Sequence, residues 1–141
     1  MPEADPLVVQ ALLSAGPFVG LKKRQLLSLA GAARKTVHKA GLEVASEGRG
    51  ALAFHVITAG DASVLVGGTA RRTLYPGDYF GEISMIDGLP RSATVVAGAD
   101  GLTTFALNRT QFWSILEKDP AVMRAVLIGL CGRIRASESS L

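Results

Sequence analysis

The chain has 141 residues, a length typical of one compact domain, so we expect a single domain covering residues 1–141. Its net charge is +3 at neutral pH. Hydrophobic residues make up 48% and charged residues 19%, which excludes a disordered acidic or basic tail. The single cysteine, Cys131, excludes a disulfide framework within the chain and fits a reducing, cytoplasmic location. No apolar run approaches about 18 residues and the first residues are acidic, so we expect neither a membrane span nor a secretory signal.

Residues 6–33 have a helical pattern. Apolar residues recur three and four positions apart, as at Leu26, Leu29 and Ala30, which indicates one buried helix face. Gly16-Pro17 separates two helical pieces. The stretch 22–39 overlaps the end of this zone and carries six basic residues and no acidic one. Such a surface is either a solvated helix face or a patch that could meet nucleic acid, lipid headgroups or an acidic partner.

In residues 34–107 the helical pattern is replaced by short segments rich in β-branched side chains. Turn signals divide these segments, and turns every 8–12 residues are typical of a sandwich or barrel. We therefore predict a mainly β fold, an eight-stranded jelly-roll-like β-roll with flanking helices. The segments are 53–57, 62–66, 94–97 and 103–107, and the turn signals include Gly60-Asp61, Gly67-Gly68, Pro76-Gly77, Gly98 and Asp100-Gly101.

Residues 108–137 predict a pair of C-terminal helices. Asn108 with Gln111 resembles a capping box, and Asp119-Pro120 is a second helix start. Cys131 on the second helix is expected to fill core space, and the tail 137–141 is expected to fray. An apolar stripe on the second helix comprises Met123, Val126, Leu127, Leu130 and Ile134.

The segment 76–95 holds the residues that carry chemistry. Gly81 lacks a Cβ, which allows a backbone or a ligand to approach closely. The stretch 82–87 is long enough for one or two helical turns, whose first amides have no partner within the helix and can face an anion. Arg91 can grip phosphate oxygens with two parallel hydrogen bonds. Glu82 would repel a phosphate but can accept hydrogen bonds from the hydroxyls of an attached sugar.

These residues resemble the phosphate-binding cassette of the cyclic nucleotide-binding domain family. The likeness rests on Phe80-Gly81-Glu82-Ile83 followed by Arg91-Ser92-Ala93-x-Val95-x-Ala97. That family includes the catabolite activator protein, the regulatory subunits of protein kinase A and the cyclic nucleotide-gated channels. The resemblance covers nearly the whole chain and implies the same β-roll, with helices before and after it.

The resemblance also implies a role for each cassette residue. Glu82 would accept a hydrogen bond from the ribose 2′-hydroxyl, Arg91 would pair with the cyclic phosphate, and backbone amides would complete the site. Ser137 stands about where the final helix touches the base in the catabolite activator protein. The expected ligand-binding residues are Phe80, Gly81, Glu82, Ile83, Ser84, Arg91, Ser92, Ala93 and Ser137.

No catalytic group is visible in the sequence. It contains no Ser-His-Asp set, nucleophile elbow or Walker-type loop, and the two histidines, His38 and His55, make a poor metal site for a cupin-type enzyme. We therefore expect no catalysis, metal or cofactor, only a cyclic nucleotide as ligand. Ser92 stands where relatives that prefer guanine often carry Thr, which favours cAMP over cGMP.

The last helix is the expected output of the sensor. Its apolar stripe could close over the ligand as a lid, or it could form the seam of a homodimer. No recognition helix for DNA follows it in this sequence. The alternatives are the sensor part of a transcription regulator, a channel or an enzyme, and a cassette that folds but binds nothing.

Overall fold

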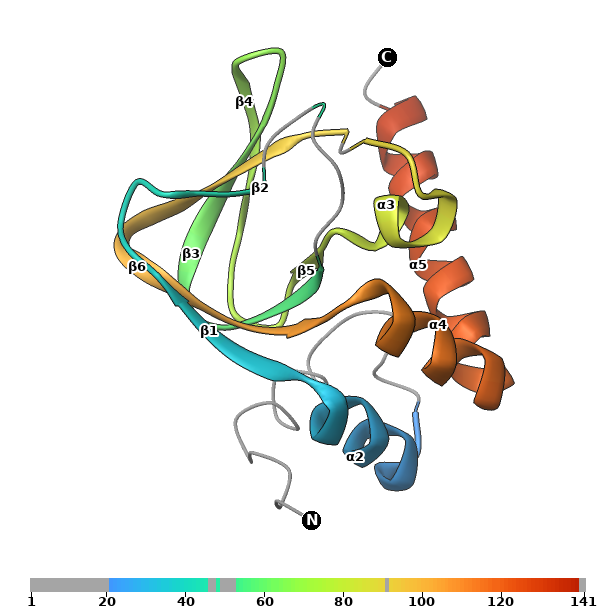
Figure 1. The fold of residues 1–141 in the computed structure, drawn as a ribbon. Helices are drawn as coiled ribbons and strands as arrows, with labels where there is room; N and C mark the ends of the chain where they lie inside the picture. Colours follow the sequence, from blue (N-terminus) through green and yellow to red (C-terminus); the bar gives the residue numbers. More distant parts are fainter. Residues whose placement is uncertain (1–20, 46–47, 49–52, 91, 140–141) are drawn as a thin grey trace.

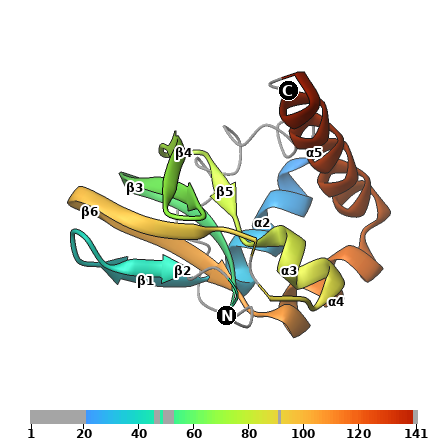
Figure 2. The same cartoon turned by 90° about the horizontal axis from the view of Figure 1, so that it is seen from above.

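A computed structural model describes residues 21–45, 48, 53–90 and 92–139 of the chain. The expected helical pattern before residue 21, including the Gly16-Pro17 break, lies outside these residues. Strands occupy one side of the molecule and helices gather at the other (Figures 1 and 2). In chain order the elements are α2 (Lys23–Ala32), β1 (Arg34–His38), β2 (Glu43–Ala45), β3 (Phe54–Val66), β4 (Thr69–Leu74), β5 (Tyr79–Phe80), α3 (Glu82–Asp87), β6 (Thr94–Leu107), α4 (Arg109–Lys118) and α5 (Pro120–Ser139).

The strands form one antiparallel sheet that confirms the mainly β fold with flanking helices. The strand order is β1-β6-β3-β4, and β2 pairs with β6 while β5 pairs with β3. The described residues contain six strands, whereas the sequence predicts eight. Part of this difference arises because the predicted strands 53–57 and 62–66 are both parts of β3, and the predicted strands 94–97 and 103–107 are both parts of β6.

β3 and β6 run through the turns that the sequence predicts inside them. β3 continues through Gly60-Asp61, and β6 continues through Gly98 and Gly101. The two strands stay paired, with register shifts near Gly60 that bend the ladder. Gly60 and Gly101 both have φ +79°, a conformation that glycine adopts without strain. These glycines therefore mark bends of long strands rather than chain reversals.

Two other predicted turns are confirmed. Gly67 and Gly68 join β3 to β4 with φ values of +59° and +80°, as a two-residue hairpin requires. Gly77 has φ +95°, and the amide of Asp78 donates to the carbonyl of Tyr75 at 2.9 Å. This second turn delivers the chain into β5, directly before the cassette helix α3.

The buried side chains form two clusters, one on each side of the sheet. The inner cluster lies within the roll and comprises Ala45, Ile57, Ala62, Val64, Leu74, Phe80, Val95, Ala97 and Leu102. The helix-side cluster joins the sheet to the helices and includes Phe54, Tyr79, Met85, Phe105, Phe112, Leu116, Val122 and Val126. Since Tyr79 and Phe80 are adjacent in β5 but belong to different clusters, this short strand connects the two cores.

The C-terminal helix pair begins where the sequence predicts. The Asn108 side chain accepts from the Gln111 amide, and the Gln111 side chain accepts from the Asn108 amide. The Asp119 carboxylate accepts from the Ala121 amide at the start of α5, and also from the side chain of Gln25 on α2. None of the described helices is long and apolar enough to cross a membrane.

The buried face of α5 differs from the predicted stripe. Within the stripe, Val126 is buried, and Met123 and Leu130 are partly buried against the helix-side cluster, but Leu127 and Ile134 are more than half exposed. Cys131 is also exposed, so the prediction that it fills the core is wrong. The helix instead buries Val122, Ala125 and Val126 in its first half. It also extends to Ser139, into the segment 137–141 that was expected to fray, and residues 140–141 lie outside the described part of the chain.

We predict that Gly60→Ala destabilises the fold far more than Gly67→Ala. Both glycines have positive φ, but a Cβ at Gly60 would overlap the carbonyl of Gly101, whereas a Cβ at Gly67 meets open space. The difference in the free energy of unfolding should be about 1–3 kcal/mol, the usual cost of overpacking. Urea unfolding of the two variants measures it, and equal losses would contradict the close approach of β3 and β6.

Candidate functional site

The cassette begins with a close approach between two segments of backbone. Gly81 follows β5 and stands directly before α3, with φ +93°. A Cβ at this position would lie 2.5 Å from the carbonyl oxygen of Ala53, so a larger residue would push the two segments apart. Gly81 therefore fixes where α3 starts and places its first residue, Glu82, against the core.

Glu82 is a buried carboxylate with a single charged partner among the described residues. It is 1% exposed, and its Oε1 accepts a hydrogen bond from Nη1 of Arg133 on α5. The contact joins residues 51 positions apart in the sequence. The charge of Arg133, whose side chain is only partly buried, offsets the cost of burying the carboxylate.

Arg133 is held by three contacts at once. Besides the ion pair with Glu82, its Nη2 donates to the carbonyl of Tyr79 at 2.8 Å. Its guanidinium carbon also lies 4.8 Å from the centre of the Tyr79 ring, within the range of a cation–π interaction. The guanidinium is therefore directed toward the cassette and not into solvent.

The second carboxylate oxygen of Glu82, Oε2, is buried and has no hydrogen-bond partner in the described part of the chain. Burial raises the pKa of Glu82 above its ordinary value of 4.5, and the charge of Arg133 opposes that rise. A buried acceptor without a donor is costly to a folded protein. An incoming hydroxyl group would supply the missing donor.

The other predicted residues near Glu82 divide between core and surface. Phe80 is buried in the inner cluster and stacks on His55, with ring centres 4.7 Å apart, so its side chain has a packing role. Ser84 is 3% exposed, and its carbonyl accepts from the Gly88 amide at the end of α3. Ile83 is 39% exposed, which leaves its side chain at the surface of the cassette.

Arg91, the predicted phosphate anchor, lies outside the described residues. The two residues after it are described: Ser92 is exposed, and Ala93 is partly buried against the inner cluster. Ser137 is exposed on α5, one helical turn beyond Arg133. Since residues four apart share a helix face, Ser137 lies on the same side of α5 as the arginine that contacts Glu82.

Arg133 is the site residue that the sequence interpretation missed. The sequence directs attention to the apolar stripe of the last helix, and nothing local indicates that a charge between Leu130 and Ile134 turns inward. One signal was available in the sequence. The helix predicted to close over the ligand carries Arg133 one turn before Ser137, and an arginine there could pair with the carboxylate of Glu82. Only the fold brings α5 to the start of α3.

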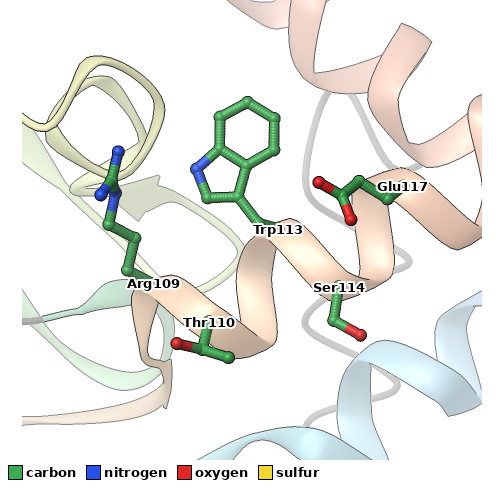
Figure 3. A pocket seen from close by; sticks show the side chains of 5 residues that line it. All are labelled: Arg109, Thr110, Trp113, Ser114 and Glu117. Atoms are coloured by element: carbon green, nitrogen blue, oxygen red, sulfur yellow. The ribbon is translucent and has the colours of Figure 1, made fainter.

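A separate hollow of about 370 Å³ lies on α4. Figure 3 shows its five lining residues, with the side chains of Arg109 and Trp113 rising from the helix toward α3. Both donate to the carbonyl of Met85, at 3.2 Å and 2.8 Å. The hollow shares no lining residue with the Glu82–Arg133 pair, so it is not part of the candidate site.

Comparison with known proteins identifies residues 35–119 with the family described as the cyclic nucleotide-binding domain. The chain is 41% identical over 71 residues to a cAMP-dependent protein kinase regulatory subunit of Yarrowia lipolytica, which covers 49% of the chain and 19% of the relative. It is 30% identical over 100 residues to a cGMP-dependent protein kinase of Plasmodium berghei, covering 71% of the chain and 12% of the relative. The chain thus spans only a small part of these relatives.

Solved structures show the same fold. The catabolite activator protein of Thermus thermophilus matches with a TM-score of 0.79 and 25% identity, over 89% of this chain and 61% of that one. The regulatory domain of Toxoplasma gondii protein kinase A, crystallised with cAMP, matches with a TM-score of 0.68 and 24% identity. That match covers 77% of this chain and 43% of the Toxoplasma chain.

We predict that Glu82 makes stability fall as the pH rises above about 4.5. Because the folded pKa of Glu82 is raised, the folded chain holds a proton that the unfolded chain has already released. The stabilising contribution of the protonated carboxyl is therefore complete below the unfolded pKa and is lost as pH rises through the folded pKa. Urea unfolding of the wild type and Glu82→Gln from about pH 4 to pH 8 measures it. The wild type should lose stability relative to the variant as pH rises, and a constant difference would contradict the effect of burial.

Proposed function

Because the chain belongs to the cyclic nucleotide-binding domain family, we propose that it is a non-catalytic sensor of a cyclic nucleotide. The cassette would hold the ligand, and α5 would carry the signal to a partner or effector domain. The family assignment supports the general class of ligand, and the arrangement around Glu82 supports the position and orientation of that ligand.

One observation carries the proposal, the buried and unpartnered Oε2 of Glu82. Arg133 engages only Oε1, so one oxygen stays available to a donor from outside the chain. A ribose 2′-hydroxyl is such a donor, because it is neutral and can approach a carboxylate without repulsion. An acceptor that no described residue satisfies is what a binding site presents before its ligand arrives.

The cyclic phosphate would lie on the other side of the ribose from this contact. Arg91 is the proposed phosphate partner, and the backbone amides at Ile83, Ser92 and Ala93 would supply further donors. Charge-assisted hydrogen bonds from a guanidinium are each worth roughly 1.5–3 kcal/mol. Both cAMP and cGMP present this ribose phosphate. Ser92 after the arginine favours cAMP, while the relatives include proteins named for either nucleotide.

We propose that ligand binding is transmitted to α5 through Arg133. Between Cys131 and Ser137, Arg133 is the one residue that is partly buried, and the others are exposed. This part of the helix therefore depends on polar contacts to Glu82 and Tyr79 rather than on apolar burial. A ligand that binds Glu82 changes the group to which α5 is attached, and so shifts the population of helix positions.

We further propose a homodimer and a location for this sensor. Exposed Leu127, Ile128 and Ile134 on α5 support a homodimer formed through this helix. The sensor would serve a regulator of transcription, a channel or an enzyme, and we place it in the cytoplasm because its one cysteine suits a reducing compartment.

We predict that Arg91→Ala weakens binding of cAMP and cGMP by about tenfold or more, because it removes the charge-assisted hydrogen bonds to the phosphate. Calorimetric titration of the purified chain measures the affinity, and thermal unfolding verifies that the variant folds. Arg71→Ala on the exposed part of β4 is the matched control. Unchanged affinity in a folded Arg91→Ala protein would remove the phosphate anchor, and no binding by the wild type would favour a degenerate cassette.

We predict that Arg133→Ala both weakens ligand binding, by about tenfold, and disconnects α5 from the ligand. In the wild type, adding a cyclic nucleotide should shift the amide resonances of residues 119–137, whereas in Arg133→Ala the shifts should stay within the cassette. Arg135→Ala, an exposed neighbour on the same helix, should behave like the wild type. A wild-type response confined to the cassette would refute the role of α5.

A further inference from the structure

Two histidines from different strands meet at one threonine inside the roll. Oγ1 of Thr104 on β6 lies 2.8 Å from Nδ1 of His55 on β3 and 3.4 Å from Nε2 of His38 on β1. The hydroxyl of Thr36 on β1 lies 2.6 Å from the Thr104 hydroxyl and 3.0 Å from the same His38 nitrogen. His55 and Thr104 are buried, whereas His38 and Thr36 are partly exposed. The four side chains therefore form one hydrogen-bonded chain that ends at the buried ring of His55.

Strand pairing places this hydrogen-bonded chain on the inner face of the roll. Thr36 pairs with Thr104, which pairs with Ile57 on β3. Directly opposed residues of neighbouring strands share a face, and Ile57 belongs to the inner cluster. His55 lies two positions before Ile57, so it points to the same face. Polar side chains thus stand on a face whose buried centre is apolar, where a hydrogen bond fixes an orientation that apolar packing alone does not.

The hydrogen bonds of this chain depend on one another. Its three contacts, from His55 to Thr104, on to Thr36 and on to His38, need one hydrogen each. The two hydroxyls supply two hydrogens, so one histidine nitrogen donates the third and the other accepts. A donor at one end therefore sets the direction of every bond up to the other end. Thr104 is the member that both histidines contact, and without its hydroxyl the ring of His55 loses this bond at Nδ1.

The ring of His55 lies flat against Phe80. The two residues are paired across β3 and β5, and their rings stack with centres 4.7 Å apart and planes 11° apart. Both are buried. Phe80 directly precedes Gly81, whose φ of +93° and close approach to the Ala53 carbonyl fix the start of α3. A displacement of Phe80 would therefore move Gly81, and with it Glu82 on the first turn of α3.

We infer that His55 is a positioning residue for the ligand, which acts through Phe80 on the carboxylate of Glu82. Thr104 fixes the plane of the His55 ring, and the ring fixes Phe80. The inference rests on the proposed function, in which Glu82 accepts a hydrogen bond from the ribose 2′-hydroxyl. We therefore expect the effect of His55 on binding to depend on the presence of that hydroxyl.

Calorimetric titration of the whole chain with cAMP and with 2′-deoxy-cAMP tests the inference. The two ligands share the base and the cyclic phosphate, and only cAMP has the 2′-hydroxyl. Thr104→Val replaces the hydroxyl that holds His55 with a methyl group of similar size. It should weaken cAMP binding by about fivefold, the worth of one hydrogen bond, and 2′-deoxy-cAMP binding by less than about twofold. Thr104→Ser keeps a hydroxyl and should bind cAMP within about twofold of the wild type.

His55→Phe separates the hydrogen bond from the stacking of the rings. Phenylalanine can stack on Phe80 but cannot bond to Thr104, so this variant should bind cAMP about fivefold more weakly than the wild type. Adding Thr104→Val to His55→Phe should change the affinity by less than about twofold, because Thr104 acts through His55. Thr103→Val is the matched control, since Thr103 adjoins Thr104 on β6 but lies on the opposite face. It should leave both affinities within about twofold of the wild type.

Equal losses for cAMP and 2′-deoxy-cAMP in Thr104→Val would overturn the inference, because a loosened fold weakens both ligands alike. No loss for either ligand would overturn it as well. Equal affinity of the wild type for the two ligands would refute the contact between Glu82 and the ribose, and absence of binding would overturn the proposed function itself. Thermal unfolding shows whether each variant is folded during the titration. If Thr104→Val does not fold, His55→Phe carries the same comparison of the two ligands.

Discussion

A carboxylate that is buried at the start of a helix stays ionised only if a positive charge lies close to it, and for Glu82 that charge is on a different helix. The ion pair with Arg133 is therefore more than a local contact. Moving a charged group from water into the protein interior costs several kcal/mol. The guanidinium of Arg133 offsets this cost for Glu82 only while α5 lies against the cassette. The charge state of Glu82 and the position of α5 are consequently linked, because each depends on the other.

The rest of the site serves to bring these two groups together. The turn at Pro76-Gly77 and the short strand β5 carry the chain inward, and Gly81 lets it pass against the Ala53 carbonyl. Tyr79 belongs to the helix-side cluster and also supports Arg133 through its carbonyl and its ring. α5 is therefore anchored in two ways, by apolar burial in its first half and by polar contacts in its second.

The sequence predicts local features of this protein well and long-range ones poorly. The capping box at Asn108 and the hairpin at Gly67-Gly68 depend on residues a few positions apart, and both are confirmed. Glycine is ambiguous, however, because positive φ serves a bend within a strand as well as a turn. For this reason Gly60 and Gly101 are predicted as turns, although they lie within continuous strands.

The same distinction applies to the site. A short sequence pattern identifies Glu82 and its neighbours, because the cassette is continuous in the chain. The contact with Arg133 depends on how α5 packs, which no local pattern encodes. The face of α5 is likewise decided by its neighbours, which bury Val122 and Ala125 and leave Leu127 exposed. Hydrophobic spacing predicts that a helix has a buried side but not how far along its length that side is covered.

The carbonyl of Met85 connects the cassette helix α3 to α4. It accepts hydrogen bonds from both Arg109 and Trp113, so one oxygen on the cassette helix is clamped by two side chains of α4. Only Asp119 separates the end of α4 from the start of α5, so these contacts connect α3 to both C-terminal helices. The cassette helix α3 is therefore connected to α5 in two ways, directly by the ion pair of Glu82 with Arg133 and indirectly through α4 by the contacts of Met85.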